Sequence, residues 1–325
     1  MAMASLKTIA LREEEHQGLS GGHSLCAGCG IPPIVRTVLG SIPGPKVAIS
    51  ATGCLEVATT RYPFTAWGVP WIHVAFENAA AVASGAEAAF RALSRRGKLS
   101  EEPVTFVVFA GDGGTYDIGL QALSGALERG HRLLYVCYNN EAYMNTGIQR
   151  SGATPYAANT TTSPVGSLGK GKAERRKDMT AIVVAHHIPY AAQAATSHWQ
   201  DLSRKVERAA QASGPSFLNV LATCPPGWGH EAKDSVRLAR IAVETHYWPL
   251  FEVVEGHYRI THRPLQQRPL EEWLDLQKRF SHLHGERGAD LVVRLQEELD
   301  DSWAQLVQRD ASDADWFRAL EEAEA

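Results

Sequence analysis

The chain has 325 residues, of which 44% are hydrophobic and 21% are charged, with 32 Lys and Arg against 36 Asp and Glu. This composition excludes an intrinsically disordered protein. No apolar run approaches the roughly 18 residues of a membrane-spanning helix, and residues 1–17 carry charges without the apolar stretch of a secretory signal. We therefore expect a globular cytoplasmic protein with no membrane span and no nucleic-acid partner.

Charge divides the chain into two units. Residues 264–325 hold 15 acidic and 7 basic side chains, whereas residues 1–263 hold 21 acidic and 25 basic ones. Apolar residues at helical spacing in the acidic unit predict helices over residues 270–282 and 289–308. Two interpretations of this helical C-terminal extension stay open: it packs on its own domain, or it docks onto a partner subunit.

Before residue 264, short apolar runs alternate with helical patterns, which is typical of an α/β fold with a mostly parallel sheet flanked by helices. The apolar runs predict strands over residues 47–51, 104–110, 133–138 and 216–222. Helices are predicted over residues 78–93 and 117–129, the second followed by Gly130 as a stop signal. The basic segment 166–178 is expected to be a mobile, solvated loop, because its Lys and Arg residues stand among Gly and Ser.

Each predicted strand ends in a distinctive group: Cys54, Asp112, Asn140 and Cys224, in chain order. Ligands of open parallel sheets bind outside the carboxyl ends of the strands. A strand, a helix and a second strand across residues 111–140 form a right-handed unit that places Asp112 beside Asn140. A carboxylate, an amide oxygen and a main-chain carbonyl suit Mg²⁺, and glycines let the backbone approach a ligand. This pattern resembles the diphosphate-binding motif of thiamine-diphosphate enzymes.

Four of the five cysteines predict a metal site. Cys26 and Cys29 form a local Cys-Ala-Gly-Cys-Gly loop, whose glycines can turn main-chain amides toward a bound sulfur, whereas Cys54 and Cys224 come from distant strand ends. Cys137 lies within a predicted strand and is expected to be an inert core thiol. Four thiolates alone do not separate structural zinc from an iron–sulfur cluster, so both stay open on spacing.

Several long motifs, in order, give the chain a specific resemblance over residues 18–260. They are GHSLCAGCG (22–30), ATGCLEVATTRYPFTAWGVPWIHVAFENAAAVASG (51–85), FAGDGGTYDIGLQALSGALERG (109–130), NNEAYMNTGIQRSGATP (139–155) and CPPGWG (224–229). They resemble the beta subunits of pyruvate:ferredoxin oxidoreductases, also called pyruvate synthases. The 2-oxoglutarate enzymes of that superfamily lack the Glu-Asn-Ala-Ala and Tyr-Met-Asn-Thr-Gly wording, so the resemblance favours pyruvate. A branched-chain 2-oxoacid or oxalate is the alternative.

The resemblance implies three cofactors and their ligands. One 4Fe-4S cluster would be bound by Cys26, Cys29, Cys54 and Cys224. Mg²⁺ would be held by Asp112, the Asn140 side chain and the Ala142 carbonyl, close to thiamine diphosphate, and Asn145 would face the substrate as a catalytic residue. Further cofactor-binding positions are expected at Thr52, Gly53, Gly111, Gly113, Gly114 and Thr146.

Three residues keep open interpretations. Glu77 and Asn78 begin a predicted helix, so they either line the cofactor pocket or cap the helix. His23 lies near the expected cluster ligands, so it either hydrogen-bonds a sulfur or the diphosphate or has an ordinary structural role.

The resemblance also implies partners. Thiamine enzymes activate the aminopyrimidine with a Glu from a second α/β domain, and about 260 residues of core leave room for the diphosphate-binding half alone. The expected partners are an alpha subunit that completes the active site, together with gamma and ferredoxin-like delta subunits. The expected reaction converts pyruvate and coenzyme A to acetyl-CoA and CO2, reversibly, and passes electrons to ferredoxin or flavodoxin. A non-catalytic, zinc-stabilised subunit that binds a nucleotide or diphosphate is the competing hypothesis.

Overall fold

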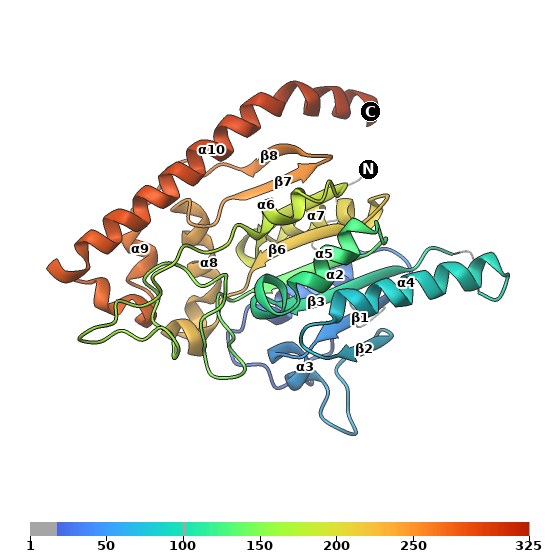
Figure 1. Ribbon diagram of the computed structural model, residues 1–325, viewed down its shortest axis with the longest axis horizontal. Coiled ribbons are helices and arrows are strands. Elements are labelled where there is room, and N and C mark those ends of the chain that lie inside the picture. The colour runs from blue at the N-terminus through green and yellow to red at the C-terminus, as the bar shows by residue number, and fades with distance from the viewer. Residues whose placement is uncertain (1–17, 100–101, 325) are drawn as a thin grey trace.

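The fold centres on one eight-stranded sheet, in a computed structural model that describes residues 18–99 and 102–324 (Figure 1). The strands are β1 (Lys46–Ala51), β2 (Trp71–Val74), β3 (Thr105–Gly111), β4 (Leu134–Asn139), β5 (Tyr190–Ala195), β6 (Ser216–Leu221), β7 (Leu250–Val254) and β8 (His257–His262). Their order is β2-β1-β3-β4-β6-β5-β7-β8. The first six in this order run parallel, whereas β7 and β8 are antiparallel to their neighbours.

Helices connect the strands and cover both faces of the sheet. The α-helices are α2 (Ile31–Ser41), α3 (Cys54–Thr59), α4 (Ala79–Arg95), α5 (Leu120–Glu128), α6 (Met179–Val184), α7 (Trp199–Gln211), α8 (Ser235–Glu244), α9 (Glu271–Leu274) and α10 (Glu286–Glu324). Two π-helical turns, η1 (Gly113–Asp117) and η3 (Pro225–Gly229), follow β3 and β6. Three 3₁₀ turns are η2 (Thr196–His198), η4 (Ala232–Asp234) and η5 (Lys278–Leu283).

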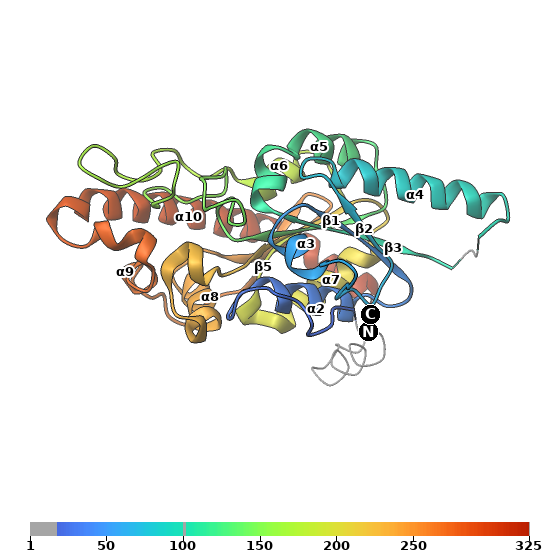
Figure 2. The ribbon, with the colours of Figure 1, turned by 90° about the horizontal axis from the view of Figure 1, so that it is seen from below.

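The core has one layer on each side of the sheet. Helices α2 and α7 cover one face and α4, α5 and α6 the other (Figure 2). Alternation along the strands supplies both layers: in β3, Val107 and Phe109 face α2 and α7, whereas Phe106 and Val108 face the opposite layer. Because both faces are buried, these strands consist of nearly continuous apolar residues.

The last helix protects one edge of the sheet. β7 and β8 form a hairpin whose two turn residues, Glu255 and Gly256, both have positive φ, as a type I′ turn requires. On the outer side of β8, Asp313 accepts a hydrogen bond from the Tyr258 N–H at 2.7 Å, and Asp310 accepts one from the Ile260 N–H at 2.7 Å. Carboxylates of α10 thus occupy the donors that an edge strand would otherwise present for pairing with another chain.

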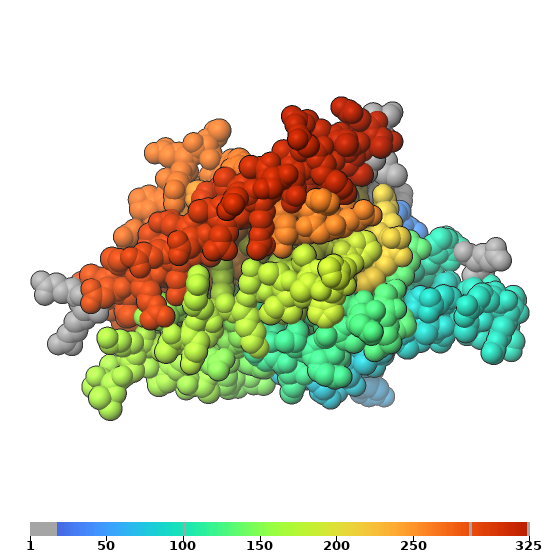
Figure 3. Space-filling model, turned by 45° about the horizontal axis from the view of Figure 1, so that its top comes forward, coloured from blue at the N-terminus to red at the C-terminus, as the bar shows by residue number. Residues whose placement is uncertain are grey.

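The C-terminal segment, residues 264–324, shares a third core with the rest of the chain. Trp273, Phe280 and Leu299 pack in one buried cluster with Trp228 and Leu238. Figure 3 shows α10 lying along the surface over the orange and yellow-green parts of the chain. These contacts agree with the interpretation that the extension packs on its own domain. The division of the chain into units 1–263 and 264–325 stays a prediction.

The predicted fold class and all four predicted strands are confirmed, with boundaries shifted by no more than one residue. β2, β5, β7 and β8 were not predicted. The helix expected over 117–129 begins at Leu120, after the π-helical turn η1, and the one expected over 289–308 extends to Glu324. The prediction of one helix over 270–282 is wrong, because this stretch forms the short helix α9, a break and the 3₁₀ turn η5.

The basic segment 166–178 is a loop with mostly exposed residues, as its composition indicated, but two of its cations make specific contacts with the rest of the chain. Lys172 is buried and donates to the Thr154 carbonyl at 2.5 Å, while the Arg176 guanidinium donates to the Tyr247 carbonyl at 2.8 Å. Acceptors distant in the sequence compensate for burying these cations.

Across the described parts of the chain, no helix has the combined length and apolar character needed to cross a bilayer. The expectation about a secretory signal concerns residues 1–17, which lie outside the described residues.

The contact between α10 and β8 gives a stability prediction. Asp313→Ala removes the acceptor of the Tyr258 N–H and should lower the free energy of unfolding by about 1–2 kcal/mol. Asp301→Ala, at an exposed position of the same helix, is the matched control and should change it by less than about 0.5 kcal/mol. Urea unfolding of both variants measures the difference, and equal stability would show that the edge contact contributes nothing.

Candidate active site

Topology brings the predicted site residues to one edge of the sheet. β1, β3, β4 and β6 are adjacent and parallel, so the loops after them meet at their carboxyl ends. A cavity of about 60 Å³, here called the strand-end cavity, lies there. The predicted site residues that line it are Thr52, Gly53, Cys54, Gly111, Gly113, Asn140, Ala142, Asn145 and Thr146.

Other predicted residues lie elsewhere. The described residues that line the strand-end cavity do not include several predicted positions: His23, Cys26, Cys29, Glu77, Asn78, Asp112, Gly114 and Cys224. Asn78 occupies the N-cap position of α4 without a side-chain capping bond, and Phe76 lines the cavity instead. The hydroxyl of Thr52 is engaged with His73 Nε2 at 2.9 Å.

Glycines bring the backbone close to the cavity wall. A Cβ atom added to Gly113 would lie 2.4 Å from a ring carbon of Tyr143, and one added to Gly111 would lie 3.2 Å from the Tyr138 ring. Gly113 is the first residue of the π-helical turn η1. Because it has no side chain, its main chain can pack directly against the Tyr143 ring. The Gly-Asp-Gly wording is thus explained by close packing.

Asp112, Asn140 and Ala142 form a convergent group of oxygen atoms. The Asn140 amide oxygen lies 2.8 Å from Asp112 Oδ1 and 2.9 Å from the Ala142 carbonyl oxygen. Rotating the amide by 180° would replace this contact by two hydrogen bonds, so its orientation depends on what the group holds. With its oxygen turned toward Asp112, the Asn140 amide would complete a set of three oxygens of the kind that a hard divalent cation requires. These residues therefore fit Mg²⁺.

The Asp112 carboxyl is fully buried. Burial raises its pKa to about 7, although the Ser151 hydroxyl donates to Oδ2 and opposes this shift. A desolvated carboxylate gains most from a nearby cation, since few other interactions offset the loss of water. The electrostatics therefore agree with the oxygen geometry.

A short loop, residues 139–142, carries two members of this group. The Asn139 side chain accepts from the Glu141 N–H at 3.1 Å and donates to the Tyr116 hydroxyl at 2.9 Å. Trp228 Nε1 donates to the Asn140 carbonyl at 2.8 Å. Asn139, Trp228 and Ser151 were not predicted as site residues. The one sequence signal for Asn139 is the pair Asn139-Asn140, because Asn139 lies at a predicted strand end and is the last residue of β4.

The four predicted cluster cysteines lie near one another. Cys26 is exposed, Cys29, Cys54 and Cys224 are half-buried, and their thiols interact electrostatically. Burial raises the pKa of the Cys29 and Cys224 thiols to about 12, against main-chain hydrogen bonds from Ile31 and Gly227 respectively. Cys137 is buried in β4, as predicted.

The four thiols do not form the close grouping that a single metal ion requires. Among residues 18–99 and 102–324, no three His, Cys, Asp or Glu side chains are grouped so as to hold one metal ion. A single zinc ion needs every sulfur within about 2.3 Å of one point. An iron–sulfur cubane holds its thiolates on separate iron atoms and so accepts a wider arrangement.

Cys54 belongs to both groups. It lines the strand-end cavity, and the Asn145 side chain hydrogen-bonds its sulfur, which opposes the rise in its pKa caused by burial. The oxygen group and the thiols are therefore neighbours across one cavity wall.

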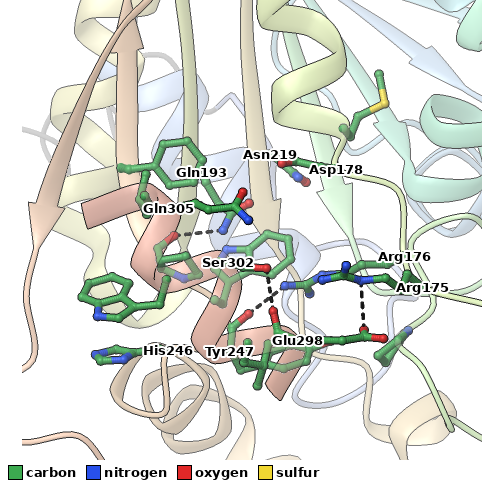
Figure 4. Close-up of a pocket in the computed structure, with 18 of the residues that line it drawn as sticks. Arg175, Arg176, Asp178, Gln193, Asn219, His246, Tyr247, Glu298, Ser302 and Gln305 are labelled. Atoms are coloured by element: carbon green, nitrogen blue, oxygen red, sulfur yellow. Dashed lines mark hydrogen bonds and ion pairs between the residues drawn. The ribbon is translucent and has the colours of Figure 1, made fainter. Parts of the chain in front are cut away.

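A larger cavity, of about 420 Å³, lies beneath α10 and is called the helix cavity (Figure 4). Arg176, Tyr247 and Glu298 are among its lining residues, and Arg175 pairs with Glu298 at 3.2 Å. None of the predicted site residues lines it among the described part of the chain. Size alone would therefore misplace the site, because three of the predicted ligands, Cys54, Asn140 and Ala142, line the smaller cavity.

Comparison with known proteins gives consistent matches. Residues 51–220 match the family model described as thiamine pyrophosphate enzyme, C-terminal TPP binding domain. The pyruvate synthase subunit PorB of Methanothermobacter thermautotrophicus is 52% identical over 286 residues, covering 88% of this chain and 96% of that protein. The PorB subunit of Thermotoga maritima is 49% identical over 312 residues, covering 93% and 95%.

Two further proteins are informative. The ketoisovalerate oxidoreductase subunit VorB of Pyrococcus furiosus is 41% identical over 302 residues, covering 92% of this chain and 95% of that protein. A solved 2-oxoglutarate:ferredoxin oxidoreductase from Magnetococcus marinus superposes with a TM-score of 0.53 at 21% identity, covering 74% of this chain and 84% of that one. At that identity the likeness concerns the fold alone.

Close packing at Gly113 gives a prediction. Gly113→Ala should displace the Tyr143 ring and lower the free energy of unfolding by about 1–3 kcal/mol, since overpacking a filled site forces its neighbours to move. Gly85→Ala in α4 meets open space and should stabilise the helix by about 0.5–1 kcal/mol. Chemical unfolding compares the two, and a Gly113→Ala chain as stable as the parent would contradict the packing argument.

Proposed function

Because the chain belongs to the family of pyruvate:ferredoxin oxidoreductase beta subunits, which are thiamine-diphosphate-dependent, we propose that it catalyses the reversible oxidative decarboxylation of pyruvate to acetyl-CoA and CO2. Electrons leave one at a time through one 4Fe-4S cluster to ferredoxin or flavodoxin. The observation that carries this proposal is the position of Cys54, which lines the strand-end cavity and lies among the other three thiols. A cluster bound there would adjoin the reacting group.

The strand-end cavity holds the diphosphate end of the cofactor in this proposal. Asp112, the Asn140 side chain and the Ala142 carbonyl bind Mg²⁺, whose remaining positions go to phosphate oxygens. The main chain at Gly111, Gly113 and Gly114, together with Thr52, Gly53 and Thr146, contacts the diphosphate. Thiamine diphosphate, when bound, supplies the electron sink for loss of CO2, and the cluster supplies a one-electron acceptor.

Asn145 acts between the two groups in this proposal. Its side chain lies at the cavity wall and hydrogen-bonds the Cys54 sulfur, so it favours the thiolate form of that cysteine. From the same position it orients the keto acid. Glu77 and Asn78 support the cavity through Phe76 and α4 and make no direct contact in this scheme.

Cys26, Cys29, Cys54 and Cys224 bind the cluster. Burial of Cys29, Cys54 and Cys224 disfavours their thiolate forms, and iron supplies the positive charge that offsets this cost. Persistent thiolate ligands suit a reducing compartment, so we place the protein in the cytoplasm.

Pyruvate is the proposed substrate because the PorB relatives are more similar than VorB, at 52% and 49% against 41% identity. A branched-chain 2-oxoacid is the second candidate, supported by the VorB match, and oxalate is the third. Both relatives are named as subunits, which supports partner chains: an alpha subunit that completes the active site, and gamma and delta subunits. Coenzyme A-dependent ferredoxin reduction by the assembled complex, measured with pyruvate, 2-oxoisovalerate and oxalate, identifies the substrate.

Asp112→Asn tests the cation site. The change keeps the side-chain size but removes the charge, so Mg²⁺-dependent thiamine diphosphate binding should weaken at least 100-fold and turnover should be lost, with the iron content unchanged. Asp178→Asn is the control, since Asn caps the α6 N-terminus as well as Asp does. Calorimetric titration of the anaerobic complex measures both, and undiminished binding by Asp112→Asn would exclude this carboxylate as a ligand.

The cluster has its own test. Anaerobically purified protein should be brown and contain about four iron atoms per chain. Cys224→Ser should lose most of this iron, whereas Cys137→Ala should keep it, because Cys137 is a core thiol in β4. Metal analysis and visible absorption decide the outcome: a colourless protein loaded with zinc would instead support the structural-zinc hypothesis.

A further inference from the structure

Glu141 takes an unusual conformation between two proposed Mg²⁺ ligands. Its φ is 68°, in the left-handed region that residues other than glycine rarely adopt. This turn lies between Asn140, whose amide contacts Asp112, and Ala142, whose carbonyl contacts the same amide. A backbone conformation of this kind persists when surrounding contacts fix it.

The Glu141 side chain is fully buried, and five contacts hold the residue. Arg279 Nη2 lies 2.6 Å from Oε2. Arg176 Nη1 lies 3.6 Å from Oε1, and the Tyr247 hydroxyl donates to the same oxygen. The Thr154 hydroxyl donates to the Glu141 carbonyl at 2.6 Å. Every polar group of Glu141 is therefore engaged, because its N–H also donates to Asn139.

Arg279 connects this carboxylate to the C-terminal segment. It lies in η5, and its guanidinium stands 4.1 Å from the centre of the Trp228 ring. Trp228 in turn donates to the Asn140 carbonyl. Arg279 thus acts on the 139–142 loop twice, through the Glu141 carboxylate and through the indole that holds Asn140.

Arg176 and Tyr247 close the other side of the network. Arg176 donates to the Tyr247 carbonyl at 2.8 Å and lies 4.6 Å from the centre of its ring (Figure 4). Tyr247 also stacks on Trp273 of α9 with ring centres 3.7 Å apart. Both residues line the helix cavity, so the wall between that cavity and the 139–142 loop is built from the groups that hold Glu141.

We propose that Glu141 and Arg279 are positioning residues for the cation site: the C-terminal segment, through Arg279, fixes Glu141 and thereby aims the oxygens of Asn140 and Ala142 at Asp112. This inference rests on the proposed function, because the cation concerned is the Mg²⁺ that accompanies thiamine diphosphate. It gives the C-terminal segment a role inside its own chain, independent of any partner subunit.

Glu141→Gln in the assembled complex is the main test. The Mg²⁺ concentration for half-maximal thiamine diphosphate binding should rise at least 30-fold, while kcat at saturating Mg²⁺ and cofactor should fall less than threefold. Without cofactor, amide hydrogen exchange of residues 139–146 should become at least tenfold faster. Arg279→Lys keeps the charge but not the planar fork, so its effect should be smaller and in the same direction.

The chain offers a matched control at Glu252 in β7. This buried carboxylate also accepts from one tyrosine, Tyr190 at 2.7 Å, and pairs with two arginines, Arg208 at 2.7 Å and Arg259 at 2.6 Å. Glu252→Gln should lower the thermal midpoint as Glu141→Gln does, yet leave Mg²⁺ affinity and the exchange of residues 139–146 within twofold of wild type.

The outcomes are distinct. Wild-type complex that binds no thiamine diphosphate with Mg²⁺ would overturn the proposed function and this inference with it. Wild type that binds, with Glu141→Gln binding equally well, would overturn the inference alone, as would an equal loss of affinity in Glu252→Gln. If Glu141→Gln does not fold, the Glu141→Gln/Arg279→Gln double variant removes both charges together, and wild-type Mg²⁺ affinity in it, or in Arg279→Lys, would overturn the inference.

Discussion

The desolvated carboxylate of Asp112 is the constraint on which the site depends. Asp112 has no exposure to solvent, and the Asn140 amide that contacts its carboxyl also contacts the Ala142 carbonyl. A buried carboxyl group is stable when it is protonated or when a positive charge lies next to it. Burial therefore raises the pKa of Asp112. The rest of the edge is arranged around this requirement: glycines keep the space open, Ser151 orients the carboxylate, and the 139–142 loop brings further oxygens to it.

Acidic and basic side chains of the C-terminal segment both make contacts inside the chain. Its carboxylates at positions 310 and 313 accept from the β8 backbone, so part of the negative charge that distinguishes the segment is used inside the chain. Its Arg279 reaches the other way, into the core beside Trp228. Composition therefore indicated a surface element, whereas single residues of the segment contact both the sheet edge and the loop that carries two proposed ligands.

Sequence patterns predicted which strand ends carry the candidate site, but not the residues that hold the 139–142 loop in place. The strands that carry the site are apolar runs rich in Val, Leu and Phe, and parallel topology makes the residues after them converge. β5 was missed because four of its six residues are Ala, which has little strand preference, and burial on both faces removes the alternation that marks a strand. The partners of Glu141 could not be predicted, since Arg279 is 138 residues away and no periodicity relates the two. The same reason explains why Lys172 and Arg176 were taken for solvated cations.

The ion pair between Glu141 and Arg279 also has a consequence during synthesis. Ribosomes add roughly 5–20 residues per second, so about 7–28 s separate the appearance of these two side chains. Until Arg279 emerges, the nascent 139–142 loop lacks the nearer of the two arginines that pair with its buried glutamate. This ion pair therefore forms only after the four strands that carry the candidate site have all been synthesised.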